Sequence, residues 1–467
     1  MGAVLGARIV GNADAIVTGV THDSTRVLPG TLFCCLVGAR FDGHDFAEAA
    51  VSSGATALLV ERQLDVDVTQ IVVPSTRSAL GPVSAAFWGD PSQAMDVIGV
   101  TGTNGKTTVV TIIEHLLAEL GQRCGVIGTL TGTRTTPEAP ELQAQLRAFA
   151  DGGYTSVAME VSSHALALGR VDGTRFAVTL FTNLGTDHLD FHGTPERYFQ
   201  AKAMLFDSRF TLLGLVNIDD VHGRLLRDAA TIPMLTYSLT DLDDLRLAGG
   251  GAEFGWRGHQ VSLPLAGRFN VSNALAAAEA LVALGHDAAL VAAALETVTA
   301  PPGRFEVVDR GQPFAVIVDY AHTPDALDAA IAALRPHVAG GGRLIVVFGA
   351  GGDRDTGKRP EMGAVTARAA DLAIVTDDNP RSEDPASIRA AILAGAPSGT
   401  LRDIGDRRAA IAAAIGEAGP RDIVLITGKG HEQGQIFGSG EKMRIEAFDD
   451  VEVARQCAGA KAGSANT

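Results

Sequence analysis

The chain has 467 residues, of which 46% are hydrophobic and 20% are charged, and its formal net charge is −16. Such values are typical of a globular protein that is too long for one hydrophobic core, and they predict roughly two to four domains. The acidic balance argues against a nucleic-acid partner, which needs a broad basic surface. The four cysteines lack metal-ligand spacing, so we expect buried thiols rather than disulfides or a zinc site.

Hydropathy and the N-terminal sequence favour a cytoplasmic protein. The first residues do not show the basic segment and apolar core of a signal peptide. No window approaches the roughly 18 consecutive apolar residues of a membrane span. We therefore expect a cytoplasmic location and no membrane span, and we further expect a monomer.

Three blocks follow one another along the sequence. Residues 1–96 contain short β-like runs at 31–37, 57–60 and 70–73 and a helical segment at 79–88. Residues 97–303 alternate strand-like and helical segments, a pattern typical of a parallel sheet covered by helices on both faces. The strands of this second block are predicted at 97–100, 123–127, 155–159, 177–181 and 213–217, and its last helices at 271–284 and 288–295.

The third block, residues 304–467, follows the linker Pro301-Pro302-Gly303 and is again of the α/β type. Its strands are predicted at 314–318, 344–348, 372–375 and 423–426. Polar residues follow each strand, at Asp319, 349–354, 377–381 and 428–432. Because ligands of open α/β sheets bind at the carboxyl ends of the strands, these polar clusters predict a binding site.

The most specific signal is a glycine-rich loop between a strand and a helix. The strand 97–100 enters Thr101-Gly102-Thr103-Asn104-Gly105-Lys106-Thr107-Thr108, which leads into an amphipathic helix at 109–120. Backbone N–H groups of such a loop, with the helix N-terminus behind it, bind a polyphosphate. Lys106 would reach the β- and γ-phosphates, and Thr107 would hold Mg²⁺. Val100 stands where the usual pattern has its first glycine, so we expect Gly102 to make the turn. The alternative is an ordinary glycine-rich turn.

Three more polar residues of this block are each open to two interpretations. Glu160 directly follows a predicted strand, where it either holds Mg²⁺ or favours a helix N-terminus through the helix dipole. His188 lies in a loop with a second histidine and two aspartates. It is either a metal or phosphate ligand or part of a polar surface turn. Such an oxygen-rich loop suits Mg²⁺ or Mn²⁺ better than Zn²⁺. Lys202 lies on an amphipathic helix, and from its spacing alone it is a solvated helix lysine.

Taken together, the motifs resemble those of the Mur ligases of peptidoglycan synthesis over nearly the whole chain. In chain order they are Thr-His-Asp-Ser at 21–24, Thr-Gly-Thr-Asn-Gly-Lys-Thr at 101–107, Thr-Thr-Pro at 135–137, Glu-Val-Ser-Ser-His at 160–164, Asp-His-Leu-Asp at 187–190, Ala-Lys at 201–202, Gly-Arg-Phe-Asn at 267–270, Asp-Tyr-Ala-His-Thr-Pro at 319–324 and Gly-Lys-Gly-His-Glu at 428–432. Within the family, the chain is most similar to the MurE type, which adds the third residue of the peptide.

The resemblance implies an α/β fold of three domains. The expected domains are a small N-terminal UDP-binding domain at 1–96, a central P-loop ATPase-like domain with a parallel sheet at 97–303, and a C-terminal Rossmann-like domain that binds the amino acid at 304–467.

The resemblance also implies roles for individual residues. Lys202 matches a lysine that is carbamoylated and so becomes an anionic Mg²⁺ ligand, and Glu160 and His188 match other residues of the metal site. With Thr107 they form the predicted metal set, and with Lys106 the predicted catalytic set. The residues matched to ATP contacts are Gly102, Thr103, Asn104, Gly105, Lys106, Thr107, Thr108, Asn270, Arg304 and Asp319. The residues matched to contacts with the UDP-muramoyl peptide are Ser24, Thr135, Thr136, Ser162 and Arg170.

Amino-acid specificity is predicted from Asp378-Asn379-Pro380-Arg381. In the family this motif accompanies meso-diaminopimelate, whereas lysine-adding members depart from it at the arginine. The distal carboxylate of diaminopimelate suits a bidentate guanidinium, and the alternative for Arg381 is an ion pair with Glu383 or Asp384. The predicted diaminopimelate-binding residues are Arg354, Asp378, Asn379, Arg381, Gly428 and Glu432.

The resemblance implies an ATP-dependent amide ligase of small molecules. ATP would phosphorylate the γ-carboxylate of D-Glu in UDP-N-acetylmuramoyl-L-Ala-D-Glu, and the amine of diaminopimelate would attack the acyl phosphate, with Mg²⁺ and Lys106 neutralising charge. The linker at 301–303 predicts closure of the third domain on the second. The alternatives are a lysine-adding Mur ligase, another amide ligase such as a folylpolyglutamate synthetase, a P-loop ATPase that drives motion or transport, and a non-catalytic nucleotide-binding protein.

Overall fold

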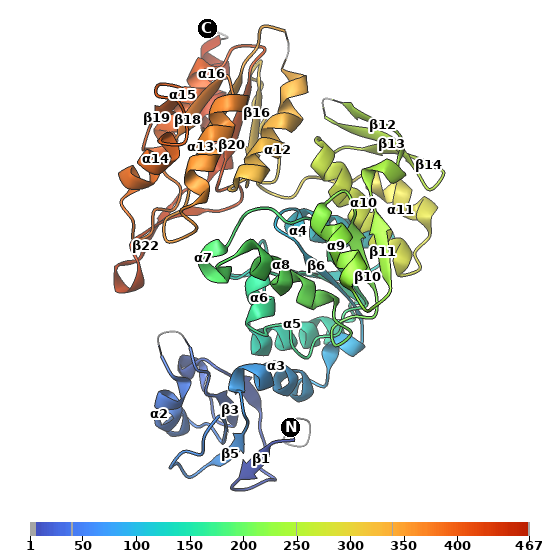
Figure 1. Ribbon diagram of the computed structural model, residues 1–467, viewed down its shortest axis with the longest axis vertical. Helices are drawn as coiled ribbons and strands as arrows, with labels where there is room; N and C mark the ends of the chain where they lie inside the picture. The colour runs from blue at the N-terminus through green and yellow to red at the C-terminus, as the bar shows by residue number, and fades with distance from the viewer. Residues whose placement is uncertain (1–5, 39–40, 249, 339, 466–467) are drawn as a thin grey trace.

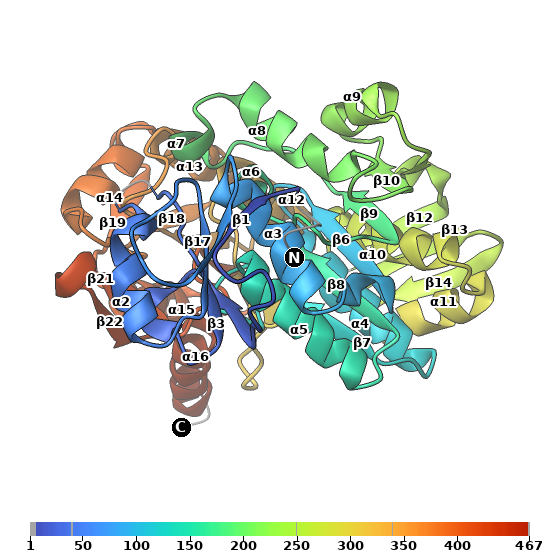
Figure 2. The ribbon, with the colours of Figure 1, turned by 90° about the horizontal axis from the view of Figure 1, so that it is seen from below.

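A computed structural model describes residues 6–38, 41–248, 250–338 and 340–465 of the chain. The chain forms three α/β domains in sequence order, coloured blue, cyan to yellow, and orange to red along Figure 1. Figure 2 views the molecule from the side of the N-terminal domain, with the central and C-terminal domains behind it on either side. The predicted α/β class with three domains is confirmed.

The N-terminal domain has a five-stranded sheet with a helix on each face. In sheet order its strands are β1 (Arg8–Val10), β5 (Thr69–Val72), β4 (Ala57–Val60), β3 (Thr31–Cys34) and β2 (Gly19–Thr21). β1 runs antiparallel to β5, and the other neighbours pair in parallel. Buried Cys34 packs with α3 (Thr76–Phe87), and buried Cys35 packs with α2 (Ala47–Ser52), because successive side chains of an extended chain point to opposite faces. Ser75 caps α3, which begins before the predicted residue 79.

The central domain is built on a six-stranded parallel sheet. In sheet order its strands are β11 (Met234–Tyr237), β10 (Gly214–Asn217), β9 (Val178–Phe181), β6 (Asp96–Thr101), β8 (Ser156–Glu160) and β7 (Cys124–Ile127). Its helices are α4 (Lys106–Glu119), α5 (Ala139–Asp151), α6 (Ser163–Ala167), α7 (Leu189–His192), α8 (Pro195–Ala203), α9 (Val221–Ala229), α10 (Arg268–Ala283) and α11 (Ala288–Leu295). Helices α4 and α10 pack on one face of the sheet and α5 on the other. The sheet is wound in both directions from β6, so a ligand crevice is expected at the carboxyl end of that strand.

A three-stranded antiparallel sheet extends the central domain and was not predicted. It consists of β12 (Asp243–Ala248), β13 (Gly251–Trp256) and β14 (His259–Leu263). Arg257 and Gly258, with φ of 49° and 83°, form the turn between β13 and β14. Positive φ at both central residues is typical of a hairpin turn that matches the strand twist. Arg-Gly is a weaker signal for such a turn than Asn-Gly, which explains why the sequence did not reveal the hairpin.

The C-terminal domain has a six-stranded sheet in which β15 alone of the described strands runs antiparallel to its neighbour. In sheet order its strands are β15 (Glu306–Val307), β16 (Ala315–Asp319), β20 (Ile423–Thr427), β17 (Leu344–Phe348), β18 (Leu372–Val375) and β19 (Leu401–Asp403). Its helices are α12 (Pro324–Leu334), α13 (Lys358–Ala369), α14 (Pro385–Leu393), α15 (Arg407–Glu417) and α16 (Asp450–Ala465), and β21 (Gly434–Phe437) with β22 (Arg444–Ala447) forms a separate ribbon. Helices α12, α13 and α14 cover one face, and α15 and α16 cover the other.

The domain limits 1–96, 97–303 and 304–467 remain our proposal. Each sheet falls within one of these ranges, except that β6 begins at Asp96. Among the residues that the structure describes, no helix combines the length and the apolar character that a bilayer crossing requires.

A buried ion pair joins α15 and α16, the two helices that cover the same face of the C-terminal sheet. Arg407 donates from Nε and Nη2 to the two carboxylate oxygens of Asp450, at 2.7 and 2.6 Å, and both side chains are fully buried. Asp450→Asn would leave a buried guanidinium without its counter-charge, so we expect the free energy of unfolding to fall by about 3–5 kcal/mol. Differential scanning calorimetry would show this as a lower transition temperature.

The matched control for Asp450→Asn is Asp328→Asn. Asp328 and Arg368 are paired at 3.1 Å, but their side chains are 54% and 67% exposed. Exposed pairs contribute about 1 kcal/mol or less, so this variant should unfold at nearly the wild-type temperature. Equal shifts in the two variants would contradict the structural role of the buried pair.

Candidate active site

A polar cavity of about 600 Å³ lies between the central and C-terminal domains, at the carboxyl ends of their parallel strands. The predicted residues that line it are Thr103, Asn104, Gly105, Lys106, Thr107, Thr135, Thr136, Glu160, Ser162, Arg170, His188, Arg304, Arg354, Asp378, Asn379, Arg381, Gly428 and Glu432. The predicted residues outside its lining are Ser24, Gly102, Thr108, Lys202, Asn270 and Asp319. The cavity therefore brings together residues that the sequence assigns to ATP, to the UDP-muramoyl peptide and to the amino acid.

The glycine-rich loop lies between β6 and α4 and lines this cavity. Gly102 and Gly105 have φ of 151° and 87°, and a Cβ at Gly102 would overlap the Thr182 side chain. The Thr182 hydroxyl donates to the Asn104 carbonyl at 2.6 Å, and the Asn104 N–H donates to Asn183 Oδ1 at 2.9 Å. The turn at Gly102 is as the sequence predicted, and side chains that follow β9 fix the loop.

Two lysines, the half-buried Lys106 and the buried Lys202, donate to the same carbonyl of this loop. Lys106 Nζ and Lys202 Nζ each lie 2.8 Å from the Gly102 carbonyl oxygen, and Lys106 also donates to Thr103 O at 2.9 Å. Lys202 is 1% exposed, so its interpretation as a solvated helix lysine is wrong. Burial, and then the charge of Lys106, lowers the pKa of Lys202 well below its usual range. This favours the neutral amine, which is the form of lysine that combines with carbon dioxide.

Glu160 faces the first turn of α4. Its Oε1 accepts from the Thr107 hydroxyl at 3.0 Å and from the Thr129 N–H at 2.8 Å. Glu160 is the last residue of β8, and the N-cap of the next helix, α6, is Ser162 rather than Glu160. Arg304 Nη2 donates to the Thr107 hydroxyl at 3.1 Å, so a residue at the start of the C-terminal domain reaches the central domain here.

His188 lies beside the buried carboxylate of Asp187, which belongs to the motif at 187–190 but was not among the predicted site residues. His188 Nε2 is 3.4 Å from Asp187 Oδ2, and burial lowers the pKa of His188 to about 3. From the C-terminal domain, Lys358 Nζ and His322 Nε2 lie 3.4 and 3.6 Å from Asp187. Although burial raises the pKa of Asp187, the hydrogen bond with His322 and the charge of Lys358 hold it well below its usual range. Asp187 therefore links the two domains next to His188.

His192, one helical turn further on, gives a pH-dependent contribution to stability. It is buried, its Nε2 lies 2.9 Å from Ser163 Oγ, and burial lowers its pKa to about 4. Below the ordinary histidine pKa of about 6.5 the unfolded chain takes up a proton that the folded protein does not. We expect the free energy of unfolding to fall from about pH 6.5 towards pH 4, with a slope of at most about 1.4 kcal/mol per pH unit from this group. Denaturation of His192→Gln over this range should show a flatter profile than wild type, and identical profiles would contradict the prediction.

Two arginines of the C-terminal domain, Arg354 and Arg381, line the cavity. The sequence left open that Arg381 forms an ion pair with Glu383 or Asp384. That interpretation is wrong, because Glu383 pairs with Arg359 at 2.8 Å and Asp384 caps α14. Burial, and then the charge of Arg354, lowers the pKa of Arg381. Two neighbouring guanidiniums that line one cavity form a site for an anion, and the planar fork of each suits a carboxylate.

Acidic and amide side chains lie beside these arginines. Asn379 Nδ2 donates to Glu432 Oε2 at 2.7 Å, and Asp378 is 6% exposed. Gly428 has φ of 115°, and a Cβ there would contact Asp378 Oδ2. Lys429 was not predicted as a site residue, although it belongs to the motif that ends at Glu432, and its ammonium contacts both Asn379 and Glu432.

The residues expected to bind the UDP-muramoyl peptide fall into two places. Thr136 Oγ1 donates to the Glu160 carbonyl at 2.9 Å and accepts from the Ser162 N–H at 3.0 Å. Arg170 Nε lies 2.8 Å from Glu138 Oε1, and Arg170, Thr135, Thr136 and Ser162 all line the cavity. Ser24 belongs to a short 3-10 helix at residues 24–26 in the N-terminal domain, outside the cavity lining.

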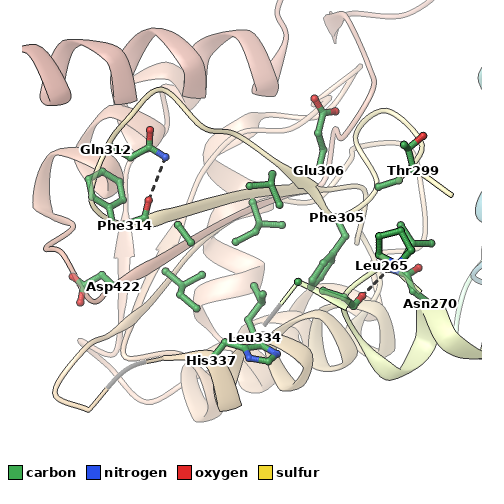
Figure 3. Close-up of a pocket in the computed structure, with 18 of the residues that line it drawn as sticks. Leu265, Asn270, Thr299, Phe305, Glu306, Gln312, Phe314, Leu334, His337 and Asp422 are labelled. Atoms are coloured by element: carbon green, nitrogen blue, oxygen red, sulfur yellow. Dashed lines mark hydrogen bonds between the residues drawn. The ribbon is translucent and has the colours of Figure 1, made fainter. Parts of the chain in front are cut away.

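A second, largely apolar cavity of about 900 Å³ is lined by residues of the central and C-terminal domains (Figure 3). Asn270 and Phe305 lie at one end of it, and Asn270 Nδ2 donates to the Ala266 carbonyl at 2.8 Å. Phe305 follows Arg304, which lines the polar cavity, so consecutive residues of the chain line the two cavities. Asp319 Oδ1 accepts from the Phe305 N–H at 2.9 Å, and burial raises the pKa of Asp319.

Sequence comparison places the chain among known proteins. The chain matches three family descriptions: Mur ligase family, catalytic domain, over residues 16–88; Mur ligase middle domain over 100–281; and Mur ligase, glutamate ligase domain, over 303–430. The UDP-N-acetylmuramoyl-L-alanyl-D-glutamate--2,6-diaminopimelate ligase of Streptomyces coelicolor is 44% identical over 95% of this chain and 93% of its own. The ligase of that name from Geobacillus kaustophilus is 45% identical over 95% of both chains. A solved structure of a ligase of that name has a TM-score of 0.66 to this chain, with 37% identity and 95% of both chains covered. The chain belongs to the Mur ligase family.

Proposed function

We propose that this Mur ligase joins meso-diaminopimelate to the D-Glu γ-carboxylate of UDP-N-acetylmuramoyl-L-Ala-D-Glu, with conversion of ATP to ADP and phosphate, in the synthesis of peptidoglycan precursors. Membership in the family makes the protein an ATP-dependent ligase of small molecules. The observation that carries the choice of substrates is one cavity lined both by the phosphate loop and by the Arg354–Arg381 pair. The relatives named above carry this activity in their names.

ATP is proposed to bind across both cavities. Its phosphates would lie on the N–H groups of the loop 102–108 and near Lys106, with Arg304 beside them. The ribose would lie near Asp319. The base would lie near Asn270, where the apolar cavity offers Phe305 and other apolar side chains.

Mg²⁺ is proposed to bind between the loop and Glu160. Thr107 and Glu160 bring a hydroxyl and a carboxylate oxygen within 3.0 Å of each other, and Mg²⁺ is commonly held by one or two carboxylates, substrate phosphates and water. His188 and Lys202, the latter as a carbamate, would complete the metal set. Bound Mg²⁺ would neutralise charge on the phosphates.

The chain's own groups would activate a poor electrophile. The D-Glu γ-carboxylate oxygen attacks the γ-phosphorus of ATP, ADP leaves, and an acyl phosphate forms. The amine of diaminopimelate then attacks the acyl carbon, the C–N bond forms, phosphate leaves and the nitrogen loses a proton. Lys106 and Arg304 place positive charge where negative charge develops on the transferred phosphoryl group. Holding three substrates in one cavity converts encounters in solution into oriented contacts.

Selectivity is proposed to come from the distal end of diaminopimelate. Its carboxylate would bind Arg354 and Arg381, and its ammonium would bind Asp378, Glu432 and the Gly428 carbonyl, with Asn379 between them. L-Lysine lacks the distal carboxylate and would leave the guanidinium pair without an anion, which disfavours its binding.

The proposal is tested by omitting each substrate in turn. ADP formation is measured with ATP, Mg²⁺, UDP-N-acetylmuramoyl-L-Ala-D-Glu and meso-diaminopimelate, and we expect ADP only from the complete mixture. ADP formation without an amino acid would favour the P-loop ATPase. Binding of ATP with no ADP from any mixture would favour a non-catalytic nucleotide-binding protein.

We also propose that the protein is a cytoplasmic monomer. One chain supplies every residue assigned to the cavity, from the phosphate loop to the arginine pair, which supports action as a monomer. The proposed ATP and UDP-linked substrates support a cytoplasmic location. Light scattering after size-exclusion chromatography should give a mass near the 48.3 kDa of one chain.

A further inference from the structure

Lys429 is a fully buried lysine beside Asn379 and Glu432, two of the residues that are proposed to bind the amino acid. It lies two residues beyond β20, the strand between β16 and β17 in the C-terminal sheet. Gly428 and Glu432, on either side of it, line the cavity, whereas Lys429 is not among the lining residues. A group placed in this way acts on a ligand through its neighbours.

The polar contacts of Lys429 are with three residues that line the cavity. Its Nζ donates to Asn379 Oδ1 at 2.8 Å and to Glu432 Oε2 at 3.0 Å, and it lies 3.9 Å from Asp378 Oδ1. Asp378 and Asn379 follow β18, and Glu432 follows β20. One ammonium therefore joins two loops that come from different strands.

These contacts fix the orientation of the Asn379 amide. Its oxygen accepts from Lys429 and from the Ile436 N–H at 3.0 Å, and its nitrogen donates to Glu432 Oε2 at 2.7 Å. With the amide reversed, its NH₂ group would face two donors and its oxygen would face a carboxylate. Glu432 Oε1 contacts the Tyr320 hydroxyl at 3.4 Å, a long hydrogen bond that leaves capacity for a ligand.

Lys429 also balances charge in this part of the cavity. Asp378 and Glu432 are both carboxylates, and the positive charge of Lys429 lies within 3.9 Å of each. Without it, the two like charges would lack this shared counter-charge. An ammonium group of a ligand binds best to carboxylates that are already oriented.

We propose that Lys429 is a positioning residue that sets the affinity for the amino-acid substrate by orienting Asn379 and Glu432 and by placing a counter-charge beside the two carboxylates. The inference rests on the proposed function, which assigns these side chains to the distal head of the amino acid. Lys429 touches neither the nucleotide nor the reacting carboxylate in this arrangement. Loss of Lys429 should therefore weaken the binding of the amino acid and leave the binding of the other two substrates unchanged.

The test compares Lys429→Met with Lys442→Met, a matched change at an exposed lysine of the same domain. In Lys429→Met the KM for meso-diaminopimelate is expected to rise about 10- to 100-fold, the loss that follows removal of a charged hydrogen-bonding group. The KM values for ATP and for the UDP-muramoyl dipeptide should stay within about twofold, and kcat within about threefold. Lys442→Met should match wild type in all four constants.

If Lys429 only stabilised the fold, the three KM values would change in a different way. A lower thermal midpoint with equal rises in all three KM values would overturn the proposal, and so would an unchanged KM for the amino acid. Glu432→Gln provides a second measurement, because its effect on that KM should be much smaller in the Lys429→Met background than in wild type, and additive effects would overturn the coupling.

A variant that fails to fold can be distinguished from a failure of the proposed function. Lys429→Gln keeps one amide donor for Asn379, and it replaces Lys429→Met if that variant does not fold; loss of folding in both would overturn the positioning role. If wild type uses L-lysine rather than diaminopimelate, the proposed function fails, and the same KM comparison made with lysine still decides the role of Lys429.

Discussion

Lys202→Ala is expected to lower kcat by about 10³-fold, with little change in the KM values of the three substrates. Lys202 Nζ is buried under the phosphate loop, 2.8 Å from the Gly102 carbonyl that Lys106 also contacts. As a carbamate it would add an anionic oxygen ligand to the metal set of Thr107 and Glu160. Removing a group that stabilises charge only during phosphoryl transfer costs about 10²–10³-fold or more in kcat. The measurement is steady-state ADP formation at saturating substrates.

Two controls identify the carbamate as the active form of Lys202. Lys202→Arg has a side chain of similar length but cannot form the carbamate, so we expect it to be as inactive as Lys202→Ala. Acetate or formate can enter the space left in Lys202→Ala and supply the missing oxygen ligand, so either should restore part of kcat. An active Lys202→Arg variant would contradict the proposed role.

Arg381→Lys is expected to lower kcat/KM for meso-diaminopimelate by about 10²–10³-fold. The guanidinium lines the cavity beside Arg354 and does not pair with Glu383, which is held by Arg359. Lysine keeps the charge but loses the planar fork that binds a carboxylate through two hydrogen bonds. A buried site built for a polar group discriminates strongly once that pairing is lost.

Two comparisons separate recognition of the distal carboxylate from a general loss of activity. With L-lysine as the amino acid, kcat/KM of Arg381→Lys should stay within about threefold of the wild-type value, because no distal carboxylate is present to be lost. Arg368→Lys, at a 67% exposed arginine, should match wild type with both amino acids. Equal losses with diaminopimelate and lysine would show that Arg381 supports the loop rather than the specificity.

The parallel sheets were predictable because their strands are short apolar runs between helical segments. Val97 to Val100 became part of β6, and the predicted strands at 344–348 and 372–375 have the observed bounds of β17 and β18. The antiparallel sheet β12–β14 was missed, since its strands mix charged, glycine and apolar residues without a strong turn signal. Strand runs that are buried on both faces are simply easier to recognise than such a ribbon.

The parts of the site that could be predicted are local in sequence. The turn at Gly102 follows from glycine spacing, whereas the burial of Lys202 contradicted what its helical spacing indicated. The ion pair of Asp187 with Lys358 joins residues 171 positions apart, and Lys429 meets Asn379 across 50 positions. Pairings of this kind depend on how domains and loops pack, and no local pattern in one sequence contains them.

The most direct test of the account is a competition between two amino acids. The protein is given ATP, Mg²⁺ and UDP-N-acetylmuramoyl-L-Ala-D-Glu with equal amounts of meso-diaminopimelate and L-lysine, and the products are identified by mass spectrometry. The account predicts the diaminopimelate tripeptide as the product, in step with ADP. A lysine tripeptide as the main product would contradict the role of the Arg354–Arg381 pair, and ADP without either tripeptide would contradict the ligase itself.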